Sequence, residues 1–368
     1  MHILIVSYDF CLEAGGIQNT SFLLAKELAK YSEITCFAPA DSHNVDITNV
    51  SFVRSRYSQW TIQRFSYKVF KELLNIHKKT PIDYVLSTTY HVCHNVTLFS
   101  LICNVPYGIL THGNEVMPIA KSSLFKTIIA KLKRKLILSN STHIFSNSHF
   151  TKDLVLKIIN CNNVYIIYPP ISYEPSYNCL NYKKRRLFSV GRIVERKGFQ
   201  NVIKALPEVI KKYDDIQYII AGDGEYLQNL KELSDSLGVN EYVHFVGKVT
   251  EKEKDDLFSQ CGLFVMPSYS IPSLMQVEGF GLVYLEAYVH GKFVIGSATG
   301  GVPDAIQDGI TGFLIKENDY NDLAKAICRF YDNDFQYNPQ LCFKKASEHH
   351  VSIIARNYFE VIRKDVLN

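Results

Sequence analysis

The sequence predicts an α/β fold made of two Rossmann-like domains, each with a parallel sheet, that face each other across a cleft. The chain has 368 residues, enough for two domains that each bury a core. Short apolar runs alternate with segments of helical periodicity, the order that builds a parallel sheet covered on both faces. One polar run without periodicity, at 171–182, interrupts the alternation. We therefore expect a first domain at 1–170, a linker at 171–186, a second domain at 187–350 and a C-terminal helix at 351–368 that packs back on the first domain.

The composition excludes several classes of protein. Hydrophobic residues make up 47% of the chain and charged residues 21%, as in globular and not in disordered proteins. The nine cysteines include no Cys-x2-Cys pair, so we expect reduced thiols and neither a disulfide framework nor a zinc site. The N-terminal apolar run is short, and no apolar run reaches about eighteen residues. We therefore expect a cytoplasmic protein without a signal peptide or a membrane span.

The first domain begins with the apolar run His2–Val6, typical of a buried parallel strand, and a helix pattern follows at 17–30. Further strands are expected near 33–38, 50–54, 83–87, 107–111, 143–146 and 164–167. Helices are expected near 62–79, 92–102, 120–138 and 149–159. Ligands of such sheets bind outside the carboxyl ends of the strands, so residues that directly follow a strand are the first candidates for a site.

Four stretches of the first domain meet this criterion, at 15–16, 88–90, 112–115 and 146–148, and two of them carry specific candidates. Gly15 and Gly16 precede Gln18 in the loop after the first strand, but without the G-x-G-x-x-G spacing, which disfavours a nicotinamide cofactor. The glycines either close a turn or bring backbone close to a substrate. His112 follows the strand at 107–111, where it can bond a sugar hydroxyl or phosphate, or simply bond loop backbone.

The segment 121–138 carries six basic residues and no acidic one between Lys121 and Lys135, and its apolar residues recur at helical spacing. Residues 1–170 hold 17 Lys and Arg against 10 Asp and Glu, a net charge of +7. Such a helix either lies on an anionic membrane surface or packs its apolar stripe on the sheet. The basic residues are not interleaved with aromatic ones, so we expect no nucleic-acid binding.

The second domain repeats the β/α alternation. Its strands are expected near 187–190, 216–221, 242–246, 263–266, 293–296 and 312–315. Its helices are expected near 199–211, 225–237, 251–260, 282–290 and 319–331, and the last forty residues are also expected to be helical.

Two glutamates, Glu278 and Glu286, stand eight residues apart around glycines that precede a helix pattern. The start of such a helix offers unpaired N–H groups and a partial positive charge, which suit a phosphate. One carboxylate before this phosphate cradle and one within the helix could hold hydroxyls on both sides of a diphosphate, as in a nucleotide sugar. Taken alone, the pair is a weak signal, and a solvated glutamate with a helix-capping glutamate around an ordinary turn is the favoured explanation.

Four motifs of the second half fall in one order: G-R-I-V-E-R-K-G-F at 191–199, A-G-D-G at 221–224, the stretch 278–286, and G-G-V-P-D-A-I at 300–306 with D-G-I-T-G-F-L at 308–314. Together they closely resemble the retaining glycosyltransferases of the GT-B fold, family 4, which include bacterial mannosyl- and N-acetylglucosaminyltransferases. The resemblance covers nearly all of 187–330, but in the first half it rests only on the glycine pair and on His112-Gly113.

The resemblance implies transfer of a hexose or N-acetylhexosamine from a UDP- or GDP-sugar to a lipid-linked acceptor, as in the biosynthesis of lipopolysaccharide, O-antigen or another bacterial surface polysaccharide. It implies no metal or other cofactor, because two cations can neutralise the diphosphate. We expect the enzyme to lie on the inner face of the plasma membrane through 121–138, and no oligomeric state follows.

The same resemblance assigns roles to single residues. Catalytic residues are Glu278, His112, Arg192 and Lys197. Donor-binding residues are Arg192, Lys197, Val249, Phe280, Gly281, Leu282 and Glu286, with Glu286 on the ribose and Glu278 on the donor sugar. Acceptor-binding residues are Gly15, Gly16 and Gln18.

Two other functions fit a two-domain fold of this kind. One is a sugar-nucleotide 2-epimerase, which would not need this pattern of cations and glutamates. The other is a non-catalytic subunit that binds a nucleotide sugar.

Overall fold

The structure is a computed structural model, and it describes residues 1–11, 16–62, 66–118, 124–173, 185–332 and 335–366. The chain folds into two compact units. Residues 1–172 and 349–368 form the first, and residues 173–348 form the second.

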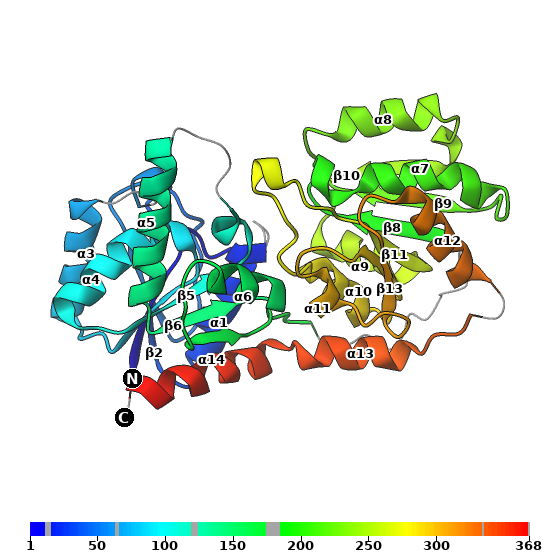
Figure 1. The fold of residues 1–368 in the computed structure, drawn as a ribbon. Coiled ribbons are helices and arrows are strands. Elements are labelled where there is room, and N and C mark those ends of the chain that lie inside the picture. Colours follow the sequence, from blue (N-terminus) through cyan, green and yellow to red (C-terminus); the bar gives the residue numbers. More distant parts are fainter. Residues whose placement is uncertain (12–15, 63–65, 119–123, 174–184, 333–334, 367–368) are drawn as a thin grey trace. The chain divides into compact units, whose positions relative to one another are not determined.

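The first unit is built on a parallel sheet (Figure 1). Its described strands follow the order β3-β2-β1-β4-β5-β6-β7. The strands are β1 (His2–Val6), β2 (Glu33–Ala38), β3 (Val50–Arg54), β4 (Tyr84–Ser87), β5 (Tyr107–Thr111), β6 (His143–Ser146) and β7 (Val164–Ile166). The helices are α1 (Gly16–Leu28), α2 (Gln59–Ile62), α3 (Tyr67–Lys79), α4 (Cys93–Cys103), α5 (Leu124–Asn140), α6 (His149–Leu156) and α14 (Val351–Val366).

Apolar residues of β1 alternate between two cores on opposite faces of this sheet. Ile3 and Ile5 belong to a core that also contains residues of α1 and α14, among them the buried Tyr358. Leu4 and Val6 belong to a second core, which α3 and α4 cover. Since successive side chains of a strand point to opposite faces, a strand with helices on both sides must be apolar throughout. The C-terminal helix is therefore an integral part of the first unit (Figure 1).

The helix expected at 62–79 begins later than the sequence indicates. Ser66 has an extended backbone with φ −142°, and α3 begins at Tyr67 directly after it. The backbone N–H of Ser66 donates to Oδ1 of Asn95 at 2.9 Å. A side chain from a different helix thus anchors the residue that precedes α3, a tertiary contact that local periodicity does not record.

The second unit has a parallel sheet of its own, with described strands in the order β10-β9-β8-β11-β12-β13. The strands are β8 (Arg186–Val190), β9 (Gln217–Ala221), β10 (Val243–Gly247), β11 (Leu263–Met266), β12 (Val294–Ser297) and β13 (Gly312–Ile315). The helices are α7 (Phe199–Ile210), α8 (Leu227–Ser236), α9 (Glu251–Gln260), α10 (Leu282–Val289), α11 (Val302–Ala305), α12 (Tyr320–Tyr331) and α13 (Pro339–Glu348).

Three further findings concern the described residues only. Their cysteines are free thiols. They contain no cluster of His, Cys, Asp and Glu with the geometry of a metal site. None of their helices is both long and apolar enough to cross a bilayer.

Candidate functional site

Three loops of the second unit meet beyond the carboxyl ends of β8, β11 and β12. The loop after β8 contains a short 3₁₀ helix, η3 (Glu195–Lys197). The loop after β11 runs beside it, because the N–H of Tyr269 donates to the carbonyl of Arg196 at 2.8 Å. In the loop after β12, the N–H of Gly301 donates to the carbonyl of Glu278 at 2.9 Å. The A-G-D-G motif follows β9 at the same edge, where the N–H of Ile193 donates to the carbonyl of Asp223 at 2.9 Å, so all four sequence motifs lie at one edge of the sheet.

Glu278 sits between two cations at this edge. One of its oxygens, Oε2, accepts from Nζ of Lys197 at 2.7 Å and from a guanidinium nitrogen of Arg196 at 3.1 Å. The exposed fractions of the three side chains are only 12% for Glu278, 16% for Lys197 and 13% for Arg196. Burial by itself would raise the pKa of Glu278, but the charges of Lys197 and Arg196 outweigh it and hold this pKa at about 2. Near neutral pH the cluster therefore carries one excess positive charge, which suits an anionic ligand.

Gly300 explains why the glycine pair at 300–301 belongs to the site. Its φ is +55°, and a Cβ at this position would lie 2.3 Å from the carbonyl oxygen of Glu278. Only glycine lets the two backbones come so close without a shift. Gly300 and Gly301 therefore pack directly against the backbone of Glu278, a role that the sequence motif alone did not reveal.

Helix α10 begins next to Glu278, with Gly281 as its N-cap and Leu282 as its first residue. Tyr284 fixes this start: its side chain is fully buried and its hydroxyl donates to the carbonyl of Met266, the last residue of β11, at 2.6 Å. Glu286 lies about one turn further along α10 and forms an ion pair with Lys254 at 3.3 Å. Burial raises the pKa of Glu286, and Lys254 opposes this rise.

Arg192 is placed differently from Lys197. It follows Gly191 just after β8, its side chain is exposed, and it forms no ion pair with a described residue. Arg196, which the sequence reasoning did not single out, is the arginine that contacts Glu278. The signal was available, because Arg196 lies in the same motif directly before Lys197. Val249 is half-buried and lies directly before Thr250, the N-cap of α9.

In the first unit, His112 and the first helix meet at Thr88. The ring nitrogen Nε2 of His112 is 2.9 Å from the carbonyl oxygen of Thr88, and the hydroxyl of Ser21 in α1 donates to that of Thr88 at 2.7 Å. A carbonyl only accepts, so Nε2 carries the hydrogen and Nδ1 is left as the acceptor in a neutral ring. Gly16 begins α1 and Gln18 lies half-buried in its first turn, whereas Gly15 lies outside the described residues.

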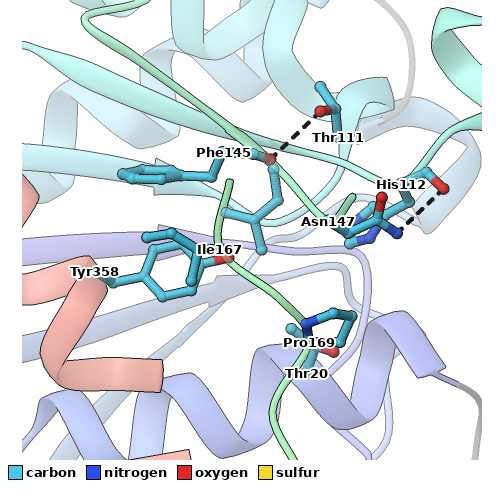
Figure 2. Close-up of a pocket in the computed structure, with 9 residues that line it drawn as sticks. Thr20, Thr111, His112, Phe145, Asn147, Ile167, Pro169 and Tyr358 are labelled. Atoms are coloured by element: carbon cyan, nitrogen blue, oxygen red, sulfur yellow. Dashed lines mark hydrogen bonds between the residues drawn. The ribbon is translucent and has the colours of Figure 1, made fainter. Parts of the chain in front are cut away.

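A small cavity borders His112 (Figure 2). Its volume is about 10 Å³, and it is lined by Thr20, Leu110, Thr111, His112, Phe145, Asn147, Ile167, Pro169 and Tyr358. About one water molecule would fill such a volume, and a sugar ring would not enter. This cavity is therefore too small to be a sugar site by itself, although His112 borders it.

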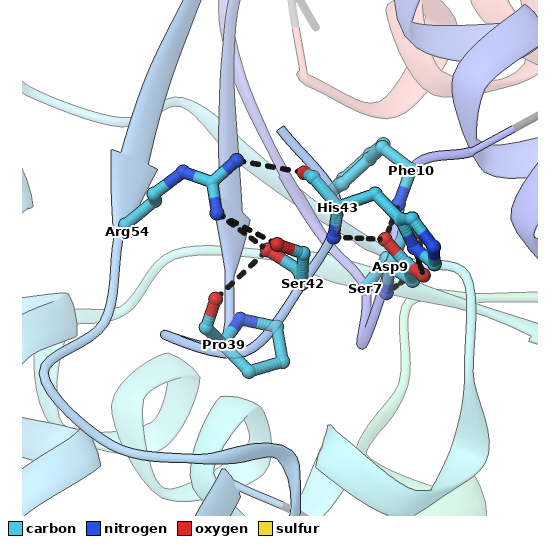
Figure 3. Close-up of polar contacts among 7 residues, drawn as sticks. All are labelled: Ser7, Asp9, Phe10, Pro39, Ser42, His43 and Arg54. Atoms are coloured by element: carbon cyan, nitrogen blue, oxygen red, sulfur yellow. Dashed lines mark hydrogen bonds and ion pairs between the residues drawn. The ribbon is translucent and has the colours of Figure 1, made fainter. Parts of the chain in front are cut away.

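Asp9 and His43 form a second polar cluster, which the sequence reasoning missed (Figure 3). Oδ1 of Asp9 accepts from the backbone N–H groups of Phe10 and His43, and Oδ2 is 2.6 Å from Nδ1 of the His43 ring. Arg54 donates to the carbonyl oxygens of Ser42 and His43 and thereby holds this loop. The loops after β1 and β2 are thus tied together at the carboxyl edge of the first sheet.

Two family profiles match the chain. That of "Glycosyl transferases group 1" matches residues 178–349, and that of "Glycosyltransferase Family 4" matches residues 14–174. The chain belongs to the family 4 glycosyltransferases. The resemblance that the four motifs suggested is thereby confirmed, and it extends to the first half of this glycosyltransferase.

Individual relatives agree with the family. The GDP-mannose-dependent alpha-(1-6)-phosphatidylinositol monomannoside mannosyltransferase of Mycolicibacterium smegmatis is 34% identical over 138 residues, which are 38% of this chain and 36% of the relative. The match thus spans about a third of that protein. Two solved structures cover nearly the whole chain at 18% identity: the sucrose-phosphate synthase of Thermosynechococcus elongatus (TM-score 0.80, 100% and 99% covered) and Anabaena HepE in complex with UDP (TM-score 0.75, 99% and 100% covered). These likenesses confirm the predicted fold class, GT-B with two Rossmann-like domains.

Proposed function

We propose that this glycosyltransferase moves a hexose or N-acetylhexosamine from a UDP- or GDP-sugar to a lipid-linked bacterial glycan, with retention of anomeric configuration. The observation that carries the proposal is the buried cluster of Lys197, Arg196 and Glu278 next to the start of α10. Its excess positive charge and the N–H groups of the first turn suit the diphosphate of a nucleotide sugar. The UDP bound to HepE, a protein of the same fold, is in keeping with this ligand.

In the proposed donor complex, Lys197 and Arg192 bind the diphosphate together with N–H groups of Phe280, Gly281 and Leu282. Glu286 accepts from the ribose hydroxyls, and Glu278 accepts from hydroxyls of the donor sugar. Because Lys197 bonds Glu278 in this structure, the diphosphate must share or replace that contact when it binds. Backbone near Val249 contacts the base, and His112 contacts the donor sugar.

The proposed chemistry is a same-face substitution. The acceptor oxygen bonds to the anomeric carbon on the face from which the diphosphate departs, and the acceptor proton passes to a diphosphate oxygen. The cations Lys197 and Arg192 stabilise the charge that develops on the leaving group. Trapping a glycosyl-enzyme on Glu278 with a fluorinated donor sugar would instead establish double displacement.

The first experiment is a thermal-shift screen of the purified protein with UDP-, GDP- and ADP-sugars. At least one of the three should raise the melting temperature, because a ligand that binds only the folded state stabilises it. Incubation with the stabilising nucleotide sugar and a glycan acceptor should then release the nucleoside diphosphate, also in excess EDTA. Conversion of the nucleotide sugar to its epimer without an acceptor would favour a 2-epimerase, and binding without any turnover would favour a non-catalytic subunit.

The acceptor side of the proposal draws on α5. Of its apolar residues, Phe125, Ile128, Leu132 and Leu136 are exposed by 74%, 46%, 62% and 58%. They cannot pack on the sheet, and the sheet-packing interpretation of this stripe is therefore wrong for these four residues. Exposed apolar side chains among lysines suit the interface of an anionic membrane, where the apolar groups enter the acyl boundary and the cations face the headgroups. We propose that α5 holds the enzyme on such a surface, where a lipid-linked acceptor resides.

Vesicle co-sedimentation tests this attachment. Wild type should bind vesicles that contain phosphatidylglycerol and not pure phosphatidylcholine. Replacing Phe125, Leu132 and Leu136 together by serine should weaken the binding at least tenfold, whereas the matched change Leu237→Ser, on a leucine of the second unit that is 40% exposed, should not. If wild type, the triple serine variant and Leu237→Ser bind the vesicles equally, α5 does not attach the enzyme to a membrane.

A further inference from the structure

Lys254 of α9 lies between two glutamates. Its Nζ is 2.8 Å from a carboxylate oxygen of Glu251, one turn earlier in the same helix, and 3.3 Å from Oε2 of Glu286 in α10. The Lys254 side chain is only 12% exposed and that of Glu286 is 21% exposed, whereas Glu251 is 45% exposed. The contact between Lys254 and Glu286 is therefore shielded from water far better than an ordinary surface ion pair.

The backbone that carries Lys254 is held firmly. Thr250 and Glu253 form a capping box at the start of α9: the Thr250 side chain accepts from the N–H of Glu253, and the Glu253 carboxylate accepts from the N–H of Thr250 at 2.7 Å. The N–H of Lys254 donates to the carbonyl of Thr250 at 2.9 Å. Lys254 thus reaches Glu286 from a fixed backbone position.

The surroundings would otherwise disfavour a charged Glu286. Burial raises the pKa of Glu286, and the nearby carboxylates of Glu251 and Asp255 raise it further. Lys254 is the cation that opposes them, and its own pKa is raised, since Glu286 and Glu251 outweigh the burial that would lower it. Among the other titratable groups nearby, Tyr173 donates to Glu251, and His290 is 3.2 Å from Asp255.

We infer that Lys254 is a positioning residue for nucleotide binding: it keeps the carboxylate of Glu286 ionised and aimed so that both of its oxygens can accept from a ribose. This inference rests on the proposed function, in which Glu286 binds the ribose. An ionised carboxylate only accepts and can serve two neighbouring hydroxyls, whereas a protonated one gives up an acceptor site to its own hydrogen. Nothing in the sequence motifs pointed to Lys254, which lies 32 residues before Glu286 in a different helix.

The test measures how strongly the protein distinguishes a ribose from a sugar without hydroxyls. Isothermal titration gives the Kd of the tightest binder among UDP, GDP and ADP and the Kd of its 2′,3′-dideoxy analogue, for wild type, Lys254→Met and Lys254→Arg. Wild type should bind the ribonucleotide at least about tenfold more tightly, as expected for hydrogen bonds to a charged group. Lys254→Met should lose most of this preference with little change in the Kd of the dideoxy analogue, and Lys254→Arg should keep it.

A second readout separates charge from mere packing. As the pH falls, protonation of Glu286 should reduce the ribose preference. Lys254→Met should move the midpoint of this loss to higher pH, because a cation is removed, and Glu251→Gln should move it to lower pH, because an anion is removed. An unchanged preference in Lys254→Met, or midpoints that move in the same direction, would overturn the role of Lys254 alone. A wild type without any ribose preference would overturn the role of Glu286. A wild type that binds none of UDP, GDP and ADP would overturn the proposed function itself.

Discussion

Replacing Glu278 by glutamine leaves the two cations of the site without their buried counter-charge. Glutamine has the shape of the neutral carboxylic acid, so the cost of the change follows from the pKa of Glu278. That pKa is about 2 in the folded protein, against an ordinary value of 4.5. Each unit of pKa difference is worth about 1.36 kcal/mol, so the charged form of Glu278 adds about 3 kcal/mol of stability near pH 7.

The sign of the pH dependence is fixed by the direction of this shift. A carboxyl whose pKa is depressed in the folded state contributes its full stability above its unfolded pKa and loses it as the pH falls toward the folded one. The stability difference between wild type and Glu278→Gln should therefore be constant from pH 8 to about pH 5.5. Below about pH 4.5 it should shrink by about 1.4 kcal/mol per pH unit.

Urea unfolding followed by circular dichroism measures this difference, with hydrogen exchange at the amides of β8 and α10 to assign the transition to the second unit. Glu208→Gln is the matched control. Its ion pair with Lys211 has the same length, 2.7 Å, but the two side chains are 66% and 71% exposed, so the loss should stay below about 1 kcal/mol. A loss below about 1 kcal/mol for Glu278→Gln as well, or a loss that does not change with pH, would refute the reasoning.

The same variant should separate binding from turnover. Without Glu278, Lys197 is no longer engaged by a carboxylate, so the affinity for a nucleoside diphosphate should stay the same or rise. The catalytic rate should fall, because the proposed contact with the donor sugar is lost. A Glu278→Gln protein with weakened diphosphate binding and normal turnover would contradict the proposed role of this residue.

Three further changes test the framework. Gly198→Ala should destabilise the second unit by more than about 2 kcal/mol and weaken nucleotide binding, because φ is +78° and the new Cβ would lie 2.0 Å from the carbonyl oxygen of Pro267; chemical denaturation and calorimetry measure both. Asp9→Ala should cost about 1–3 kcal/mol in urea unfolding, because two backbone N–H groups lose their buried acceptor, and a change within error would show that water replaces it. Tyr358→Ala should destabilise the first unit by about 3–5 kcal/mol in the same assay, whereas a small loss would mean that α14 contributes little to that core.

The elements of the fold could be predicted because their signals are local. A strand covered by helices on both faces is largely apolar, and residues 3–6 of the run His2–Val6 show this in the sequence itself. Carboxyl ends of parallel strands share one edge, so a residue just after a strand, such as His112, could be named as a candidate in advance, whereas Lys197 was named through the family resemblance. Two features had no local signal: the start of α3, where Ser66 bonds Asn95 of a different helix, and the single turn of α11.

By itself, then, the sequence determined which segments become strands and helices, the order of the motifs and the family to which they belong. Only the tertiary structure decided which charges meet: Lys197 and Arg196 reach Glu278 across about eighty residues of chain, and Lys254 reaches Glu286. Periodicity records neighbours within a turn or a strand, whereas an ion pair depends on where loops from distant strands end. The exposed stripe of α5 has the same origin, since the pattern shows that a helix is amphipathic but not which face the sheet covers.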